Sequence, residues 1–215
     1  MVKIIIIGIV GKTASGKSTA SACIESLVKS LSKSVLVIDV DSLAKSIYCK
    51  NNSVLKDLRA CFGDSIFCED GTIKYEILAN KVFSQRCELE KVNKLMFPLI
   101  ISEVKELINK NIDKDFTIID AAILFNCKLY RLCDYIILIK ANVSKRKKFL
   151  KCKRTNLSDL DIKLRISGQY IKIIKKFVDF IVVNDGSKSD LQEKVDIIFK
   201  FINKGEKIKK PAAVF

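Results

Sequence analysis

Residues 11–18 read GKTASGKS, which fits the pattern G-x-x-x-x-G-K-[ST] of a phosphate-binding loop, or P-loop. The glycines of such a loop let the backbone curl, so that its N–H groups and the start of the next helix point toward an anion. Lys17 is expected to reach the β- and γ-phosphates of a nucleotide, and Ser18 to offer its hydroxyl to Mg²⁺. A glycine turn that merely begins a helix is the alternative. The flanks favour the P-loop, because an apolar run precedes the pattern and a helical stretch follows it.

Two aspartates lie at the ends of apolar runs, where catalytic acids are often found. Asp41 comes just after the run at 34–39 and could orient or deprotonate an acceptor hydroxyl. It could equally cap a helix that begins near Ser42. Asp120 ends the run at 116–120 and could hold Mg²⁺ directly or through water, or simply cap the end of a strand. The residue pattern leaves both pairs of alternatives open.

The net charge of +15 is concentrated in one segment, since residues 140–176 contain 13 Lys or Arg and only two acids. Such a cluster suits a polyphosphate substrate, a nucleic acid or a membrane surface, and it could also be an ordinary solvated face. Guanidinium groups match phosphate oxygens and stabilise charge that develops during phosphoryl transfer. The arginines of this segment, Arg146, Arg154 and Arg165, are therefore candidate phosphate ligands.

The elements that must position these residues can be read from five short apolar runs rich in Ile and Val, at 4–10, 34–39, 116–120, 134–139 and 179–184. They are continuous rather than alternating, as in parallel strands covered on both faces, and helical stretches separate them. We therefore expect an α/β fold with a doubly wound five-stranded parallel sheet, whose ligands lie at the carboxyl ends of the strands.

The rest of the chain suggests two helical insertions in a single domain. We expect a core of about 1–40, 113–143 and 177–204, a helical substrate-binding insertion of about 41–112 and a basic helical lid of about 144–176. Residues 205–215 are expected to be a frayed tail. No apolar run approaches the roughly 20 residues of a membrane span, and the N-terminal run is too short for a secretory signal. The eight cysteines form no C-x-x-C pair and there is no histidine, which favours buried, reduced thiols over zinc.

Six weak motifs occur in a characteristic order. They are VIDVDSLAK at 37–45, FGDSI with DGTI at 62–73, VF at 82–83, FPLI at 97–100, RISGQ at 165–169 and DFIVVNDGS at 179–187. In this order and spacing, together with the P-loop, the chain resembles dephospho-coenzyme A kinases from about residue 3 to residue 203. The resemblance implies ATP as donor, Mg²⁺ as cofactor and the ribose 3′-hydroxyl of dephospho-coenzyme A as acceptor.

The resemblance also implies roles for particular residues. Lys17, Asp41 and Arg154 would be catalytic, and Ser18 and Asp120 would hold the metal. The acceptor would be bound by Asp41, Tyr75, Phe97, Asp120 and Arg165. ATP would be bound by Gly11, Ala14, Ser15, Gly16, Lys17, Ser18, Thr19, Arg146, Asn184 and Gly186. The expected partners are small-molecule substrates in the cytoplasm, with no stable nucleic-acid or membrane partner, and the protein would be a monomer or a small homo-oligomer.

Some positions depart from the pattern of that family. Phe97 stands where a histidine is usual, Tyr75 where an arginine is usual, and residues 120–126 lack the usual proline and glutamate. These changes bear on the acceptor, so a P-loop kinase for another nucleoside or nucleotide is the alternative. A nucleic-acid-binding P-loop ATPase is a further alternative, although base-stacking aromatics are sparse in the basic segment.

Overall fold

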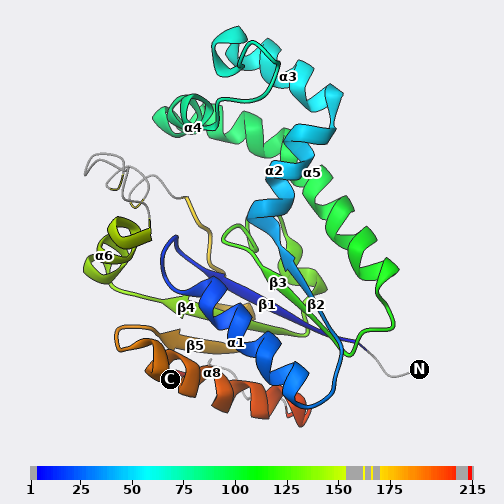
Figure 1. Cartoon of the computed structure of the whole chain (residues 1–215), viewed down its shortest axis with the longest axis vertical. Coiled ribbons are helices and arrows are strands. Elements are labelled where there is room, and N and C mark those ends of the chain that lie inside the picture. Colours follow the sequence, from blue (N-terminus) through cyan, green and yellow to red (C-terminus); the bar gives the residue numbers. More distant parts are fainter. Residues whose placement is uncertain (1–3, 154–161, 163–165, 167–169, 207–212, 215) are drawn as a thin grey trace. The chain divides into compact units, whose positions relative to one another are not determined.

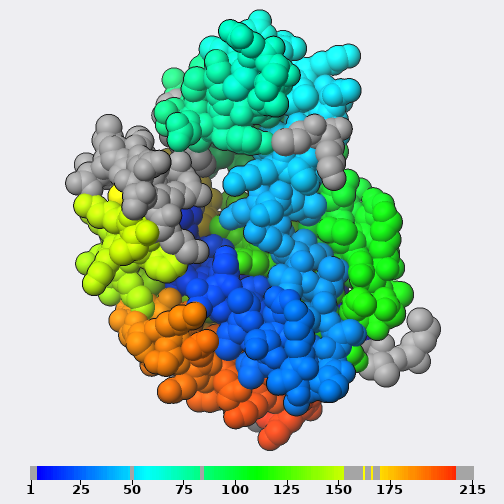
Figure 2. All heavy atoms as spheres, viewed as in Figure 1, coloured from blue at the N-terminus to red at the C-terminus, as the bar shows by residue number. Residues whose placement is uncertain are grey.

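The computed structural model describes residues 4–153, 162, 166, 170–206 and 213–214. Figure 2 draws the residues outside this description in grey. Arg154 and Arg165, the two lid arginines of the sequence prediction, lie outside the described residues. The chain forms two compact units, of which the first comprises residues 1–39 and 107–215 and the second comprises residues 40–106.

The first unit is built on a parallel sheet with the strand order β2-β3-β1-β4-β5-β6. Its strands are β1 (Ile5–Gly11), β2 (Val35–Asp39), β3 (Phe116–Asp120), β4 (Tyr135–Lys140), β5 (Phe180–Val183) and β6 (Ala213–Val214). The five predicted strands are confirmed, each within one residue at either end. The short β6 pairs with β5, so the prediction of a frayed tail is wrong for Ala213 and Val214.

Apolar side chains from strands and helices form the core of this unit. Helices α1 (Lys17–Ser30) and α8 (Lys188–Asn203) lie side by side against the sheet (Figure 1). Ile24 of α1 and Val195 of α8 are fully buried in the same cluster as Ile118 of β3. Because both helices are anchored by this cluster, the loops that precede them are held at the carboxyl edge of the sheet. Helix α6 (Val143–Lys153) follows β4, and short 3₁₀ turns occur at Leu129–Leu132 and Lys175–Phe177.

The second unit is helical. It contains α2 (Val40–Lys50), α3 (Asn52–Phe62), a 3₁₀ turn (Asp64–Ile66), α4 (Tyr75–Ser84) and most of α5 (Arg86–Lys110). The side chain of Asn51 caps α3 by accepting hydrogen bonds from the N–H groups of Ser53 and Val54. Val54, Leu58, Val92 and Met96 are among the buried side chains that hold α3 and α5 in this unit.

The cysteines differ in part from the sequence expectation. The seven whose surroundings are described are free thiols, and Cys127 is buried, which raises its pKa to about 11. Cys61, Cys87 and Cys152 are exposed, so the expectation of burial is wrong for them. The described residues include no cluster of three or more potential metal-ligating side chains. None of the described helices is long and apolar enough to cross a membrane.

Candidate functional site

The predicted strand–turn–helix context of the P-loop is confirmed. β1 ends at Gly11, α1 begins at Lys17, and Gly16 precedes the helix with a φ of 102°. Ala14 also has a positive φ, 61°. The Ser15 N–H donates to the Lys12 carbonyl at 3.0 Å, which closes the turn. The backbone therefore has the curled conformation that gathers N–H groups around an anion.

Close packing requires glycine at both ends of the loop, and backbone conformation requires it at position 16 as well. A Cβ at position 11 would collide with the carbonyl oxygen of Ile139. A Cβ at position 16 would collide with the side-chain amide nitrogen of Asn184, and the positive φ there is itself unfavourable for other residues. The loop is thus fitted between β4 and the segment that follows β5.

Lys17 and the next two residues occupy the first turn of α1. The Lys17 side chain is 8% exposed, and it forms no ion pair with any residue that the structure describes. Ser18 is exposed and Thr19 is half-buried. A lysine buried at a helix N-terminus is opposed by the helix dipole, and an anion bound at the same place offsets that cost.

Arg146 of α6 reaches the P-loop from a distant part of the sequence. Its side chain is 2% exposed, and its Nε–H donates to the carbonyl of Thr13 at 2.8 Å. Burial lowers the pKa of this guanidinium from its ordinary value, although arginine remains a cation in proteins. Its Nη2 is buried with no hydrogen-bond partner within the described residues. A phosphate oxygen would satisfy such a group.

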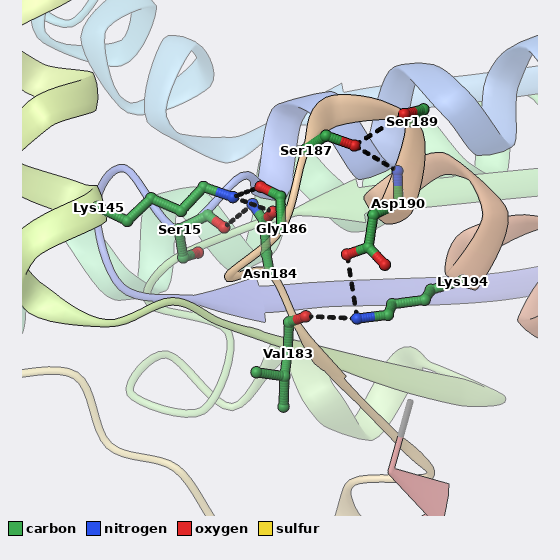
Figure 3. Close-up of polar contacts among 9 residues, drawn as sticks. All are labelled: Ser15, Lys145, Val183, Asn184, Gly186, Ser187, Ser189, Asp190 and Lys194. Carbon is green, nitrogen blue, oxygen red and sulfur yellow. Dashed lines mark hydrogen bonds and ion pairs between the residues drawn. The ribbon is translucent and has the colours of Figure 1, made fainter.

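The segment after β5 forms the second contact with the P-loop (Figure 3). Asn184 is 7% exposed, and its Nδ2 donates to the carbonyl of Ser15 at 2.8 Å. The ammonium of Lys145 donates to Asn184 Oδ1 at 2.8 Å and also to the carbonyl of Gly186. Ser187 caps α8 by accepting from the Asp190 N–H. Asn184 and Gly186, both predicted ATP ligands, are thus held next to the loop.

A pocket of about 200 Å³ lies between these elements. The P-loop, α6 and the segment after β5 all contribute to its wall, including the aromatic ring of Phe149 and the apolar side chain of Leu191. The lining residues are Ala14, Gly16, Thr19, Lys145, Phe149, Asn184, Gly186, Ser187, Lys188 and Leu191. A mostly apolar pocket with a few polar groups beside a phosphate loop suits the base of a nucleotide.

Asp120 lies at the same edge of the sheet as the P-loop. It is 7% exposed, and it pairs in register with Ile9 of β1, two residues before Gly11. Asp39 at the end of β2 is the register partner of Asp120 on its other side. Two carboxylates therefore end adjacent strands, and oxygen ligands of this kind suit Mg²⁺.

The remaining predicted site residues belong to the second unit. Asp41 is exposed in the first turn of α2, which begins at Val40, two residues earlier than the cap prediction required. Tyr75 begins α4, is 40% exposed and meets the ring of Tyr48 edge-on with a centroid distance of 6.3 Å. Phe97 is half-buried within α5.

Sequence reasoning missed Lys145 and Phe149 as parts of the nucleotide pocket. Both occur in a segment with so many lysines that no single residue stands out. The one available signal was helical spacing, because positions three and four apart on a helix share a face, and Phe149 lies three residues after Arg146 and four after Lys145. Asp39 is the last residue of the apolar run at 34–39, but its pairing with Asp120 depends on how β2 and β3 lie in the sheet.

The comparison with known proteins decides to which family a chain with this site belongs. The model of the dephospho-CoA kinase family matches residues 5–190, which include the P-loop, Asp41, Asp120, Arg146 and Asn184. This chain belongs to the dephospho-CoA kinase family. Its activity is accordingly the ATP-dependent phosphorylation of dephospho-coenzyme A, the last step of coenzyme A biosynthesis.

Individual relatives agree with the family assignment. A dephospho-CoA kinase from Fusobacterium nucleatum is 32% identical over 196 residues, which is 90% of this chain and 96% of the relative. One from Lactobacillus acidophilus is 29% identical over 195 residues, 89% of this chain and 94% of the relative.

Two solved structures share the fold. TT1252 from Thermus thermophilus superposes with a TM-score of 0.70 at 23% identity, and covers 92% of this chain and 97% of its own. The dephospho-CoA kinase from Campylobacter jejuni gives a TM-score of 0.58 at 22% identity, and covers 93% of this chain and 98% of its own.

Proposed function

We propose that this kinase transfers the γ-phosphoryl group of ATP to the ribose 3′-hydroxyl of dephospho-coenzyme A, with its donor site at the P-loop of the first unit. The observation that carries the proposal is the pair of buried cations at that loop. Lys17 is largely buried at the end of the P-loop. Arg146 is hydrogen-bonded to Thr13 within the P-loop. Two cations held out of solvent at a curled, N–H-rich loop suit the phosphates of a nucleotide.

In this scheme the ammonium of Lys17 binds the β- and γ-phosphates, and the backbone N–H groups of the P-loop surround them. The unpaired Nη2 of Arg146 donates to a further phosphate oxygen. The base enters the pocket lined by Phe149 and Leu191. Because these groups are already in place, they stabilise charge on the transferring phosphoryl group without reorganising.

The residues of the first unit fit Mg²⁺ by the chemistry of their donors. Ser18 supplies an exposed hydroxyl after the P-loop lysine, and Asp120 supplies a largely buried carboxylate at a neighbouring strand end. Both are hard oxygen ligands, and Mg²⁺ in kinases takes only one or two protein ligands beside water and phosphate. Bound there, the ion would neutralise charge on the β- and γ-phosphates.

Asp41 is the residue that we assign to the acceptor hydroxyl. Its carboxylate accepts a hydrogen bond from that hydroxyl, orients it for attack and takes up its proton. Asp41 is suited to this because it is exposed in the first turn of α2. The acceptor site would also include Tyr75 and Phe97, whose aromatic rings suit the adenine of dephospho-coenzyme A. The second unit is then the acceptor-binding part of the enzyme.

Arg154 and Arg165 complete the proposal as lid residues that bind the transferring group and the acceptor. Their segment would close over the substrates and exclude water, as lids do in this class of reaction. We further propose that the enzyme works in the cytoplasm as a monomer or small homo-oligomer.

Product analysis tests this function. Purified protein is incubated with ATP labelled in the γ-phosphate and dephospho-coenzyme A, and the product is analysed by mass spectrometry and ³¹P NMR. We expect the label on the 3′-oxygen, and no transfer to a 3′-deoxy analogue of the acceptor. Transfer to other nucleosides, with dephospho-coenzyme A unreactive, would instead support the alternative of a kinase with a different acceptor.

A further inference from the structure

Two lysines bind the segment that joins β5 to α8 or the ends of the two elements that flank it (Figure 3). The ammonium of Lys194 donates to the Val183 carbonyl at 3.0 Å and forms an ion pair with Asp190 at 3.1 Å. From the opposite side, the ammonium of Lys145 donates to Asn184 Oδ1 at 2.8 Å and to the Gly186 carbonyl. Lys194 belongs to the same helix that the segment enters, whereas Lys145 comes from α6. Lys145 therefore links α6 to this wall of the nucleotide pocket.

The charge of Lys145 also fixes which way the Asn184 amide points. An ammonium group can only donate, so the oxygen of the amide must face Lys145 and the nitrogen must face away from it. The nitrogen then meets the carbonyl of Ser15, to which it donates at 2.8 Å in a buried contact. Lys145, Asn184 and Ser15 thus form a hydrogen-bonded chain with a single direction, from α6 to the P-loop.

This chain reaches a phosphate-binding group. In a trans peptide the carbonyl and the following N–H point in opposite directions. Anchoring the Ser15 carbonyl on Asn184 therefore fixes the direction of the Gly16 N–H, one of the donors at the start of α1. The close approach of Asn184 to Gly16 shows how little room this peptide has to rotate.

The start of α6 is itself tied to the same segment. The Asn142 N–H donates to Asp185 Oδ1 at 2.9 Å, and Asn142 Oδ1 accepts from the Lys145 N–H at 2.8 Å. The neighbouring Arg146 holds Thr13. Lys145 and Arg146, which are consecutive in α6, thus hold the segment after β5 and the P-loop. The base pocket lies between these two segments.

We propose that Lys145 is a positioning residue for the donor nucleotide. Through Asn184 it sets the direction of the Gly16 N–H, and through Gly186 it fixes the wall of the base pocket, so both are formed before ATP arrives. A preformed site binds more tightly because less ordering remains to be done on binding. The inference rests on the proposed donor site at the P-loop, and it assigns a role to a lysine that the family resemblance leaves without one.

The direct test measures ATP binding to Lys145→Ala by calorimetry in the absence of acceptor. Lys148→Ala is the matched control, because Lys148 is an exposed lysine on the same helix. We expect Lys145→Ala to weaken ATP binding about tenfold, as loss of hydrogen bonds from a charged group does. Lys148→Ala should change it less than twofold, and Lys145→Arg should recover part of the loss. Equal effects of the Lys145→Ala and Lys148→Ala variants would overturn the proposal.

A double-mutant cycle separates a chain of contacts from two independent ones. If Lys145 acts through Asn184, the variant carrying both Lys145→Ala and Asn184→Ala should bind ATP about as well as the weaker single variant. If the two substitutions together weakened ATP binding by the product of their separate effects, the hydrogen-bonded chain would be contradicted. In turnover assays we expect the KM for ATP to rise while kcat and the KM for dephospho-coenzyme A change less than twofold; a fall in kcat alone would contradict a positioning role.

The binding assay also keeps this inference distinct from the proposed function. ATP binding that is sensitive to Lys145, in a protein that does not phosphorylate dephospho-coenzyme A, would support the positioning role and contradict the acceptor assignment. Normal phosphorylation of dephospho-coenzyme A, with ATP binding unchanged by Lys145→Ala, would support the acceptor assignment and contradict the positioning role.

Discussion

The Nε–H of Arg146 donates to the main-chain carbonyl of Thr13 at 2.8 Å, across 133 positions of sequence. This contact joins α6 to the P-loop and leaves the buried Nη2 of the same guanidinium without a partner in the described residues. One side chain thus braces the loop with one nitrogen and offers another to a ligand. Lysine could supply the charge but not this geometry, because its donors all radiate from one nitrogen, whereas the guanidinium carries its donors on separate nitrogens in a planar fork.

Arg146→Ala and Arg146→Lys should both weaken ATP binding about tenfold to a hundredfold, because each loses a fork of charged hydrogen bonds. Calorimetric titration with ATP measures the effect. Arg131→Ala is a suitable control, since Arg131 is exposed and lies over the ring of Tyr130 at 6.0 Å. Wild-type affinity in Arg146→Lys would mean that charge alone matters at this position.

Lys17→Ala should lower kcat by about 10²–10³-fold, the range seen when one preorganised donor to developing charge is removed. The fold should survive, because Lys17 forms no ion pair with the described residues. The measurement is steady-state turnover with thermal unfolding as a check. Lys29→Ala on the same helix removes only an exposed pair with Glu25, and it should turn over normally. Near-normal turnover in Lys17→Ala would refute its assignment to the phosphates.

Gly16→Ala should abolish ATP binding and destabilise the protein. A left-handed residue other than glycine costs about 1–2 kcal/mol, and the new methyl group would also displace the Asn184 amide. Chemical denaturation and ATP titration test the two effects. Gly63→Ala is the control: its φ of 74° and ψ of 179° also disfavour any side chain, but no atom lies within 4 Å of the added methyl group. It should destabilise the protein while leaving ATP binding intact.

Asp41→Asn should reduce kcat by about 10²–10⁴-fold, the usual contribution of a general base, with ATP binding retained. Asparagine keeps the size of the side chain but cannot accept the proton. Single-turnover rates and ATP titration separate the two properties. If ATP affinity fell and the chemical step did not, Asp41 would be a metal ligand or a structural cap rather than the acceptor base.

Asp115 should make stability depend on pH in the acid range. The pKa of its carboxyl is lowered mainly by a hydrogen bond from the Ser34 N–H at 2.7 Å. A second hydrogen bond, from the Ser34 hydroxyl at 2.8 Å, lowers it further. The folded pKa therefore lies below the unfolded value of about 3.9. The resulting stabilisation is complete above that value and disappears as the pH falls below it, through the folded pKa.

The measurement is denaturant unfolding of wild type and Asp115→Asn between about pH 7 and pH 2. The variant should be less stable at neutral pH, and the difference should shrink below about pH 4. Asp113→Asn, at an exposed neighbouring position, should show little difference at any pH. A constant difference for Asp115→Asn across the range would contradict the role of its charge.

The sheet and the P-loop were predictable because both depend on local sequence. Continuous Ile- and Val-rich runs such as 116–120 specify buried strands, and the glycine spacing of 11–18 specifies the turn. The two-residue β6 escaped prediction because a strand that short has no sequence signal and forms only by pairing with β5.

Contacts between distant segments were not predictable. Asp39 and Asp120 are register partners, and the register between β2 and β3, which the second unit separates in the sequence, leaves no local pattern in the residues. Lys145 and Arg146 differ in their contacts from the exposed Lys147 and Lys148 only through the face of α6 that they occupy. A helix that is charged all round carries no periodic signal to mark that face.

The activity of this chain is the phosphorylation of dephospho-coenzyme A. The most direct test is the rate of ADP release by purified protein with ATP and Mg²⁺, measured with and without dephospho-coenzyme A. We predict strong stimulation by dephospho-coenzyme A, one coenzyme A formed per ADP, and no stimulation by adenosine. ATP binding without any stimulation by dephospho-coenzyme A would contradict this activity.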